Sequence, residues 1–150
     1  MEAEVYPNPT VAEFIDQNFI PVRLHVKTHP EAMARFNVQW TPTVLILDFN
    51  GVERHRIEGF LETEDFLAQL ELGAAKVAFA NSDFANAEQR FRAIVEKLPK
   101  TDAAAEALYW AGVSKYKGSG DAAALGATAK AFTERYSDSS WAKKSKIWAA

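Results

Sequence analysis

The step from Thr41 to Pro42 limits what this chain can fold into more than any other feature of its sequence. A proline fixes φ and lacks the backbone N–H, so in a sheet it is confined to the first position of a strand, an edge or a bulge. Residues 44–47 follow as an unbroken apolar run, which is typical of a buried strand. Residues 48–51 contain Asp, Asn and Gly and predict a turn, and residues 52–57 predict the returning strand of a β-hairpin.

Two helices and one more strand are expected before this hairpin. Thr10 is a candidate N-cap, with Glu13 completing a capping box, for a helix that ends near residue 18. Residues 20–26 alternate between apolar and polar, which predicts a strand. Its apolar face would consist of Ile20, Val22, Leu24 and Val26. Residues 30–36 begin with Pro, which favours the first turn of a short helix.

The chain changes character near residue 72. Five of its six prolines precede residue 43, whereas Ala dominates the later sequence. Thr63 is expected to cap a helix that buries Phe66, Leu67, Leu70 and Ala74 and joins the two parts. We therefore expect an α/β part over residues 1–72 and an all-helical part over residues 73–150.

The first part resembles the thioredoxin fold in its order of helix, strand, helix, Thr-Pro, strand, strand and helix. The matching stretches are residues 19–26, 38–43, 48–51 and 57–60. In that family the proline is cis and lies beside the active site, and the residue before it offers backbone hydrogen bonds to an extended peptide. The resemblance therefore implies a cis Pro42 and a peptide-binding loop formed by Trp40, Thr41 and Pro42.

The chain departs from the family in one large respect. The family's CxxC motif and the central strand before it have no counterpart, and the sequence contains no cysteine. Two explanations stay open: a segment upstream of Met1 that carries both, or a domain that has lost them. An incomplete sheet leaves backbone edges unpaired. Direct pairing of residues 22–26 with residues 43–47, or a homodimer that pairs through the incomplete sheet, would remove that defect.

The second part repeats itself at a spacing of 38 residues. Ala104 aligns with Ala142, and Trp110 aligns with Trp148. Repeats of this length are typical of stacked helical hairpins. The last helix is expected over residues 141–150.

The repeats resemble tetratricopeptide (TPR) motifs of the kind found in arrays of bacterial envelope-assembly proteins. Two patterns carry the resemblance: Phe84-x2-Ala87-x3-Phe91-x7-Pro99 and Leu108-x3-Gly112-x3-Tyr116. Tyr109, Trp110 and Tyr116 are candidates for a peptide groove. The alternative is that they form the core between helices.

No residue is assigned a catalytic role. A thiolate nucleophile and a cysteine-bound metal both require cysteine, which is absent. His25, His29 and His55 lack the spacing of a metal site, and Asp48 fits a turn better than an acid–base pair with Glu58. We expect no metal and no cofactor.

Charge and hydropathy exclude several classes of partner. The net charge of −3 gives no electrostatic basis for binding nucleic acid or an anionic membrane. No apolar run approaches the roughly 20 residues of a membrane span. The first residues are acidic and lack the apolar core of a signal peptide, so we expect the chain as written to stay in the cytoplasm.

The sequence thus favours a non-catalytic module that binds a protein or peptide. The competing hypothesis is a thiol–disulfide oxidoreductase whose CxxC segment lies upstream of Met1. Thiol–disulfide exchange requires an attacking thiolate, which this chain does not supply.

Overall fold

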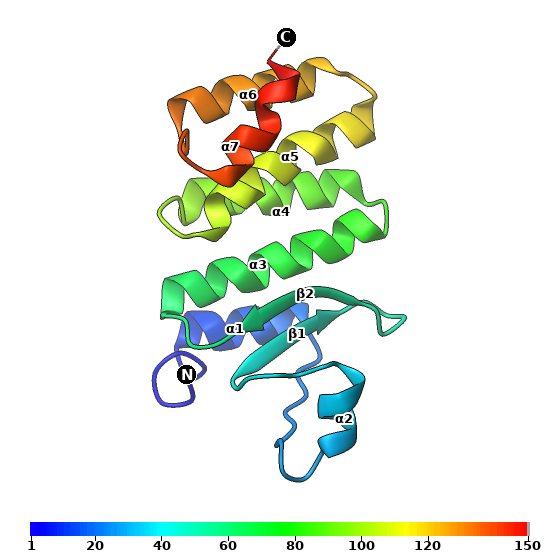
Figure 1. Ribbon diagram of the computed structural model, residues 1–150, viewed down its shortest axis with the longest axis vertical. Helices are drawn as coiled ribbons and strands as arrows, with labels where there is room; N and C mark the ends of the chain where they lie inside the picture. Colours follow the sequence, from blue (N-terminus) through cyan, green and yellow to red (C-terminus); the bar gives the residue numbers. More distant parts are fainter. Residues whose placement is uncertain (150) are drawn as a thin grey trace.

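The computed structural model describes residues 1–149. A small α/β part at one end continues into a stack of helices that ends at the C-terminus (Figure 1). The elements in chain order are α1 (Pro9–Asn18), α2 (Pro30–Arg35), β1 (Thr43–Leu47), β2 (Glu53–Glu58), α3 (Thr63–Ala80), α4 (Phe84–Lys97), α5 (Ala103–Ser119), α6 (Ala123–Glu134), α7 (Ser140–Ser145) and the 3-10 helix η1 (Lys146–Trp148).

The cap of helix α1 lies two residues earlier than expected. The side chain of Asn8, not Thr10, accepts hydrogen bonds from the backbone N–H groups of Thr10 and Val11, at 3.0 and 3.4 Å. Pro9 occupies the first helical turn, where its missing N–H is harmless. The prediction of Thr10 as the cap is therefore wrong, because Pro9 already adopts the helical φ and shifts the start toward Asn8.

The predicted β-hairpin is confirmed. β1 and β2 pair antiparallel, with Val44 opposite Ile57. Asp48 closes the turn, because its Oδ1 accepts the N–H groups of Asn50 and Val52 at 2.9 and 3.0 Å. The bond from Val52 is the main cause that holds the pKa of Asp48 below its usual value, and Arg54 acts in the same direction.

The predicted strand over residues 20–26 is wrong. Within residues 1–149 the sheet contains only β1 and β2, and residues 20–25 have no regular structure. Every residue from 20 to 28 is exposed. An alternating pattern makes a strand only where a neighbouring edge completes the hydrogen-bond ladder, and no such edge reaches this segment. Direct pairing of residues 22–26 with β1 is accordingly absent.

Helix α3 joins the two parts of the molecule, as expected from the sequence. It packs against α1 and both strands and also against α4 and α5. It begins at Thr63, but its cap position is Glu62 and no side chain caps it, so the prediction of Thr63 as the cap is wrong. The expected boundary between residues 72 and 73 falls inside this helix. Phe66 and Leu70 are buried, as predicted.

Antiparallel helices form the rest of the chain. Ala87, Phe91 and Phe132 are buried between them. Gly112 of α5 lies so close to Thr128 of α6 that a Cβ there would overlap the threonine side chain. The expected single helix over residues 141–150 is instead α7 followed by η1, and Ala150 lies outside the described residues. No helix within residues 1–149 is long and apolar enough to cross a membrane.

Candidate functional site

The loop before β1 has the geometry expected from its sequence. The Thr41–Pro42 peptide bond is cis. Thr43 Oγ1 donates to the carbonyl oxygen of Trp40 at 2.6 Å, and the N–H of Gly59 donates to the carbonyl oxygen of Pro42 at 2.8 Å. Both bonds fix the loop to the hairpin. The Trp40 side chain nevertheless remains 68% exposed.

One edge of β1 faces away from β2. In an antiparallel ladder, residues alternate between those bonded to the partner strand and those whose N–H and C=O point outward. Because the carbonyl oxygen of Pro42 accepts from Gly59, just after β2, the outward backbone groups of β1 fall on Thr43 and Leu45. Within residues 1–149 no strand pairs with that edge. The loop and the edge together form a row of backbone groups suited to receiving an extended chain.

The segment between α1 and β1 is only loosely attached. Within the described chain, α2 packs against no other helix or strand. Its end is held by Arg56 of β2, whose guanidinium donates to the carbonyl oxygens of Phe36 and Asn37. Arg56 also pairs with Glu53 at 2.7 Å.

Exposed apolar side chains gather in the same half of the molecule. Most of the large exposed ones lie between residues 20 and 60: Ile20, Val22, Leu24, Val26, Trp40, Leu47, Phe49, Val52 and Phe60. The sequence pattern predicts the first four on one face of a strand.

The candidate groove residues of the helical part, Tyr109, Trp110 and Tyr116, all lie on α5. Tyr109 stacks on Trp148, with ring centroids 4.7 Å apart, and Trp110 meets Phe79 edge to face at 5.3 Å. Tyr116 lies further along α5 and is 38% exposed. Trp110 and Tyr109 thus take part in an aromatic cluster between helices.

The three histidines are dispersed. His25 is exposed, and His29 precedes α2. The His55 side chain faces α3. Its Nε2 lies 2.6 Å from Gln69 Oε1, and its Nδ1 lies 3.3 Å from Lys76 Nζ. Burial is the main cause that lowers the pKa of His55, and Lys76 adds to it. Within residues 1–149 no group of three potential metal ligands is found.

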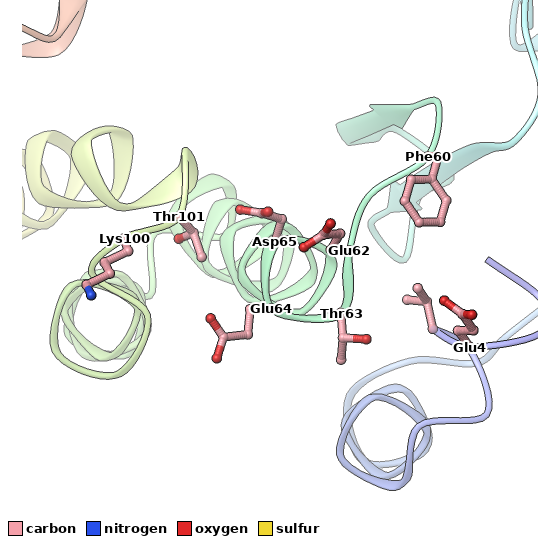
Figure 2. Close-up of a pocket in the computed structure, with 9 residues that line it drawn as sticks. Glu4, Phe60, Glu62, Thr63, Glu64, Asp65, Lys100 and Thr101 are labelled. Carbon is pink, nitrogen blue, oxygen red and sulfur yellow. The ribbon is translucent and has the colours of Figure 1, made fainter.

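A cavity that the sequence did not reveal lies at the start of α3 (Figure 2). Its volume is about 430 Å³. It is lined by Glu4, Val5, Phe60, Glu62, Thr63, Glu64, Asp65, Lys100 and Thr101. The acidic run at residues 62–65 was visible in the sequence, but acidic residues at a helix start also stabilise the helix dipole. Three segments distant in sequence meet here, which no local pattern could predict.

Comparison with known proteins identifies the first part of the chain. The family model described as a thioredoxin-like domain matches residues 1–74. No curated protein and no solved structure matches the chain.

Proposed function

We propose that the thioredoxin-like domain of residues 1–74 binds an extended polypeptide at the loop formed by Trp40, Thr41 and Pro42. One observation carries the proposal: an exposed aromatic ring stands beside an unpaired strand edge. Strand addition draws affinity from main-chain hydrogen bonds and selectivity from side-chain contacts. The outward backbone groups of Thr43 and Leu45 would supply the hydrogen bonds, and the Trp40 side chain would supply the selective contact.

The proposal is one of binding without thiol chemistry. Thiol–disulfide exchange begins with attack by a thiolate, and the 150 residues contain no cysteine. Hydrogen bonding by a backbone edge needs no sulfur. The loop would therefore hold a peptide without reacting with it.

We further propose that the helical part is a short TPR-like array. The 38-residue repeat and the alternating helices α4 to α7 support it. The tight contact between Gly112 and Thr128 supports the close helix approach that small residues allow in such hairpins. Tyr109, Trp110 and Tyr116 would then contribute mainly to inter-helix packing, and Tyr116 is the one of the three on an exposed surface.

Selection from a displayed library of random peptides tests the peptide-binding proposal. Peptides that bind the full chain should lose about tenfold or more in affinity with Trp40→Ala, because burial of an aromatic side chain is worth 1.4 kcal/mol or more. N-methylation of the bound peptide should weaken binding at alternate residues only, because alternate N–H groups face the β1 edge.

Phe49→Ala is the matched control. Phe49 is 98% exposed and lies in the hairpin turn of the same domain, away from the loop. It should bind the selected peptides like the unmodified protein. Equal binding by Trp40→Ala, or an N-methylation pattern without alternation, would contradict the proposal.

A further inference from the structure

Residues 20–26 have the composition of a strand but none of the contacts of one. Ile20 is 90% exposed and Val22 is 76% exposed. Leu24 and Val26 are 40% and 39% exposed. Aliphatic residues at alternate positions fit a pleated, half-buried surface. Leaving them in water forgoes the stabilisation that burial would give.

Within residues 1–149 no strand pairs with the outer edge of β1. Natural edge strands are usually protected by charged residues, bulges or a covering segment. The outward positions Thr43, Leu45 and Leu47 carry no charge. The bulge at Ile46 and Leu47 affects only the end of the strand.

From these two observations we propose that two copies of this chain associate by strand exchange, with residues 20–26 of each copy adding to the β1 edge of the other. Each copy carries both a donor segment, residues 20–26, and an acceptor edge on β1. A dimer with one two-fold axis would therefore pair both β1 edges. The donor is long enough to cover the five residues of β1. Its apolar side chains would become buried at the interface.

Within one copy, residues 20–26 and β1 do not pair. The chain between them turns through α2, and Arg56 fixes the end of α2 to the hairpin through the carbonyl oxygens of Phe36 and Asn37. The donor segment begins directly after α1, which packs on α3. Pairing between two copies would complete the sheet while Arg56 stays bound to the end of α2 and α1 stays packed on α3.

This inference does not rest on the proposed peptide site, although both use the β1 edge. A bound peptide and a second copy would compete for Leu45 and Thr43. Association of the protein alone is measured without any peptide. A negative result there leaves peptide binding untouched, and failure to bind peptide leaves association untouched.

Sedimentation equilibrium of the full chain over a wide range of micromolar concentrations is the first test. The protein should be a dimer at the upper end. The double variant Val22→Lys, Leu24→Lys should raise the dissociation constant by about tenfold or more per residue, because each change removes a buried aliphatic group. Both sites are exposed in the single copy, so circular dichroism should remain unchanged. Ile147→Lys, at a residue 80% exposed on η1, is the matched control and should dimerise normally.

Disulfide trapping is the second test, and the absence of natural cysteine makes it clean. A mass-tagged Leu45→Cys protein is mixed in turn with Val22→Cys, Leu24→Cys and Val26→Cys proteins. At least one mixture should form a heterodimer faster than Leu45→Cys mixed with Ile147→Cys, because paired strands bring the two Cβ atoms close enough to bond. A monomer at every concentration, an unchanged dimer in the double lysine variant, or trapping no faster than the control would each overturn the proposal.

Discussion

At the residue scale, single contacts set how closely the hairpin approaches the helices. Gly73 of α3 lies directly under Ile46, and a Cβ there would overlap the Cδ1 of Ile46 and lie 3.3 Å from the Cβ of His55. The end of the Ile46 side chain can rotate away, but Ile46 Cγ1 at 3.2 Å and the Cβ of His55 lie closer to the strand backbones and can move less. The glycine is required by the close approach of helix and sheet.

Gly73→Ala should lower the free energy of unfolding by about 1–3 kcal/mol, the usual cost of overpacking. Gly126→Ala is the matched control, because its nearest neighbour, a backbone oxygen, would lie at 3.7 Å and the residue is helical. That change should be neutral or raise the free energy of unfolding by up to about 1 kcal/mol. Urea unfolding of both variants measures the difference. Equal stability of the two would mean that α3 does not approach the sheet this closely.

His55 should make stability depend on pH. Its pKa in the folded protein lies below the ordinary value of about 6.5, so the unfolded chain binds more protons between the two values. The free energy of unfolding should therefore fall as pH decreases below about 6.5. Gln69, Lys76, Glu106 and Glu53 are the polar and charged neighbours that act on the ring.

Urea unfolding at a series of pH values, compared between the unmodified protein and His55→Gln, isolates this effect. Glu71 titrates with the opposite sign, because burial raises its pKa, but it is present in both proteins. The free energy of unfolding of the unmodified protein should fall more steeply below about pH 6.5 than that of His55→Gln. Parallel profiles would exclude His55 as the source.

At the level of helices and strands, some elements form from local sequence alone, whereas others need a neighbouring strand to pair with. The hairpin follows from local chemistry: Pro42, the apolar run and the Asp48 turn all specify it, and it forms as predicted. Residues 20–26 carry an equally clear pattern but form no strand, because a ladder needs a second edge. The cap of α1 was missed by two residues, although Pro9 at the first turn indicates Asn8.

The candidate site divides in the same way. The position of Thr41 and Pro42 could be predicted, since a proline before a buried strand is a local signal. The exposure of Trp40 and the stacking of Tyr109 on Trp148 could not, because both depend on which segments pack together.

Arg56 should control the order of α2. Removing its bonds to Phe36 and Asn37 in Arg56→Ala should speed amide hydrogen exchange in α2, because no other helix or strand of residues 1–149 packs on α2. Exchange in α3 to α6 should be unchanged. Arg92→Ala, which removes an ion pair with Glu88 within α4, is the control and should leave α2 unaffected. Unaltered exchange of α2 in Arg56→Ala would show that something else holds it.

At the scale of the whole molecule, α3 makes the α/β part and the helical part share one framework. It packs on the sheet through Gly73 and on α4 and α5 beyond it. The chain should therefore unfold in a single transition, with the hairpin and the helices losing protection together. Hydrogen exchange in increasing urea measures this. Separate transitions for β1 and for α5 would contradict a shared framework.

The 150-residue chain should also show no insulin-reducing activity. Reduction of a disulfide requires an attacking thiolate, and the chain has no cysteine to provide one. Thioredoxin assayed in parallel is the positive control. Turnover by this chain would overturn the interpretation of the loop as a binding surface without thiol chemistry.

Nuclear magnetic resonance of the ¹⁵N-labelled chain with a library-selected peptide locates the bound peptide. Binding at the Trp40 loop predicts that the Trp40 indole and the amides of Thr41, Thr43 and Leu45 shift on titration, with nuclear Overhauser effects between peptide and β1 backbone protons. Shifts confined to the helical part, around Tyr109 and Tyr116, with no change at Trp40 or Thr41, would contradict it.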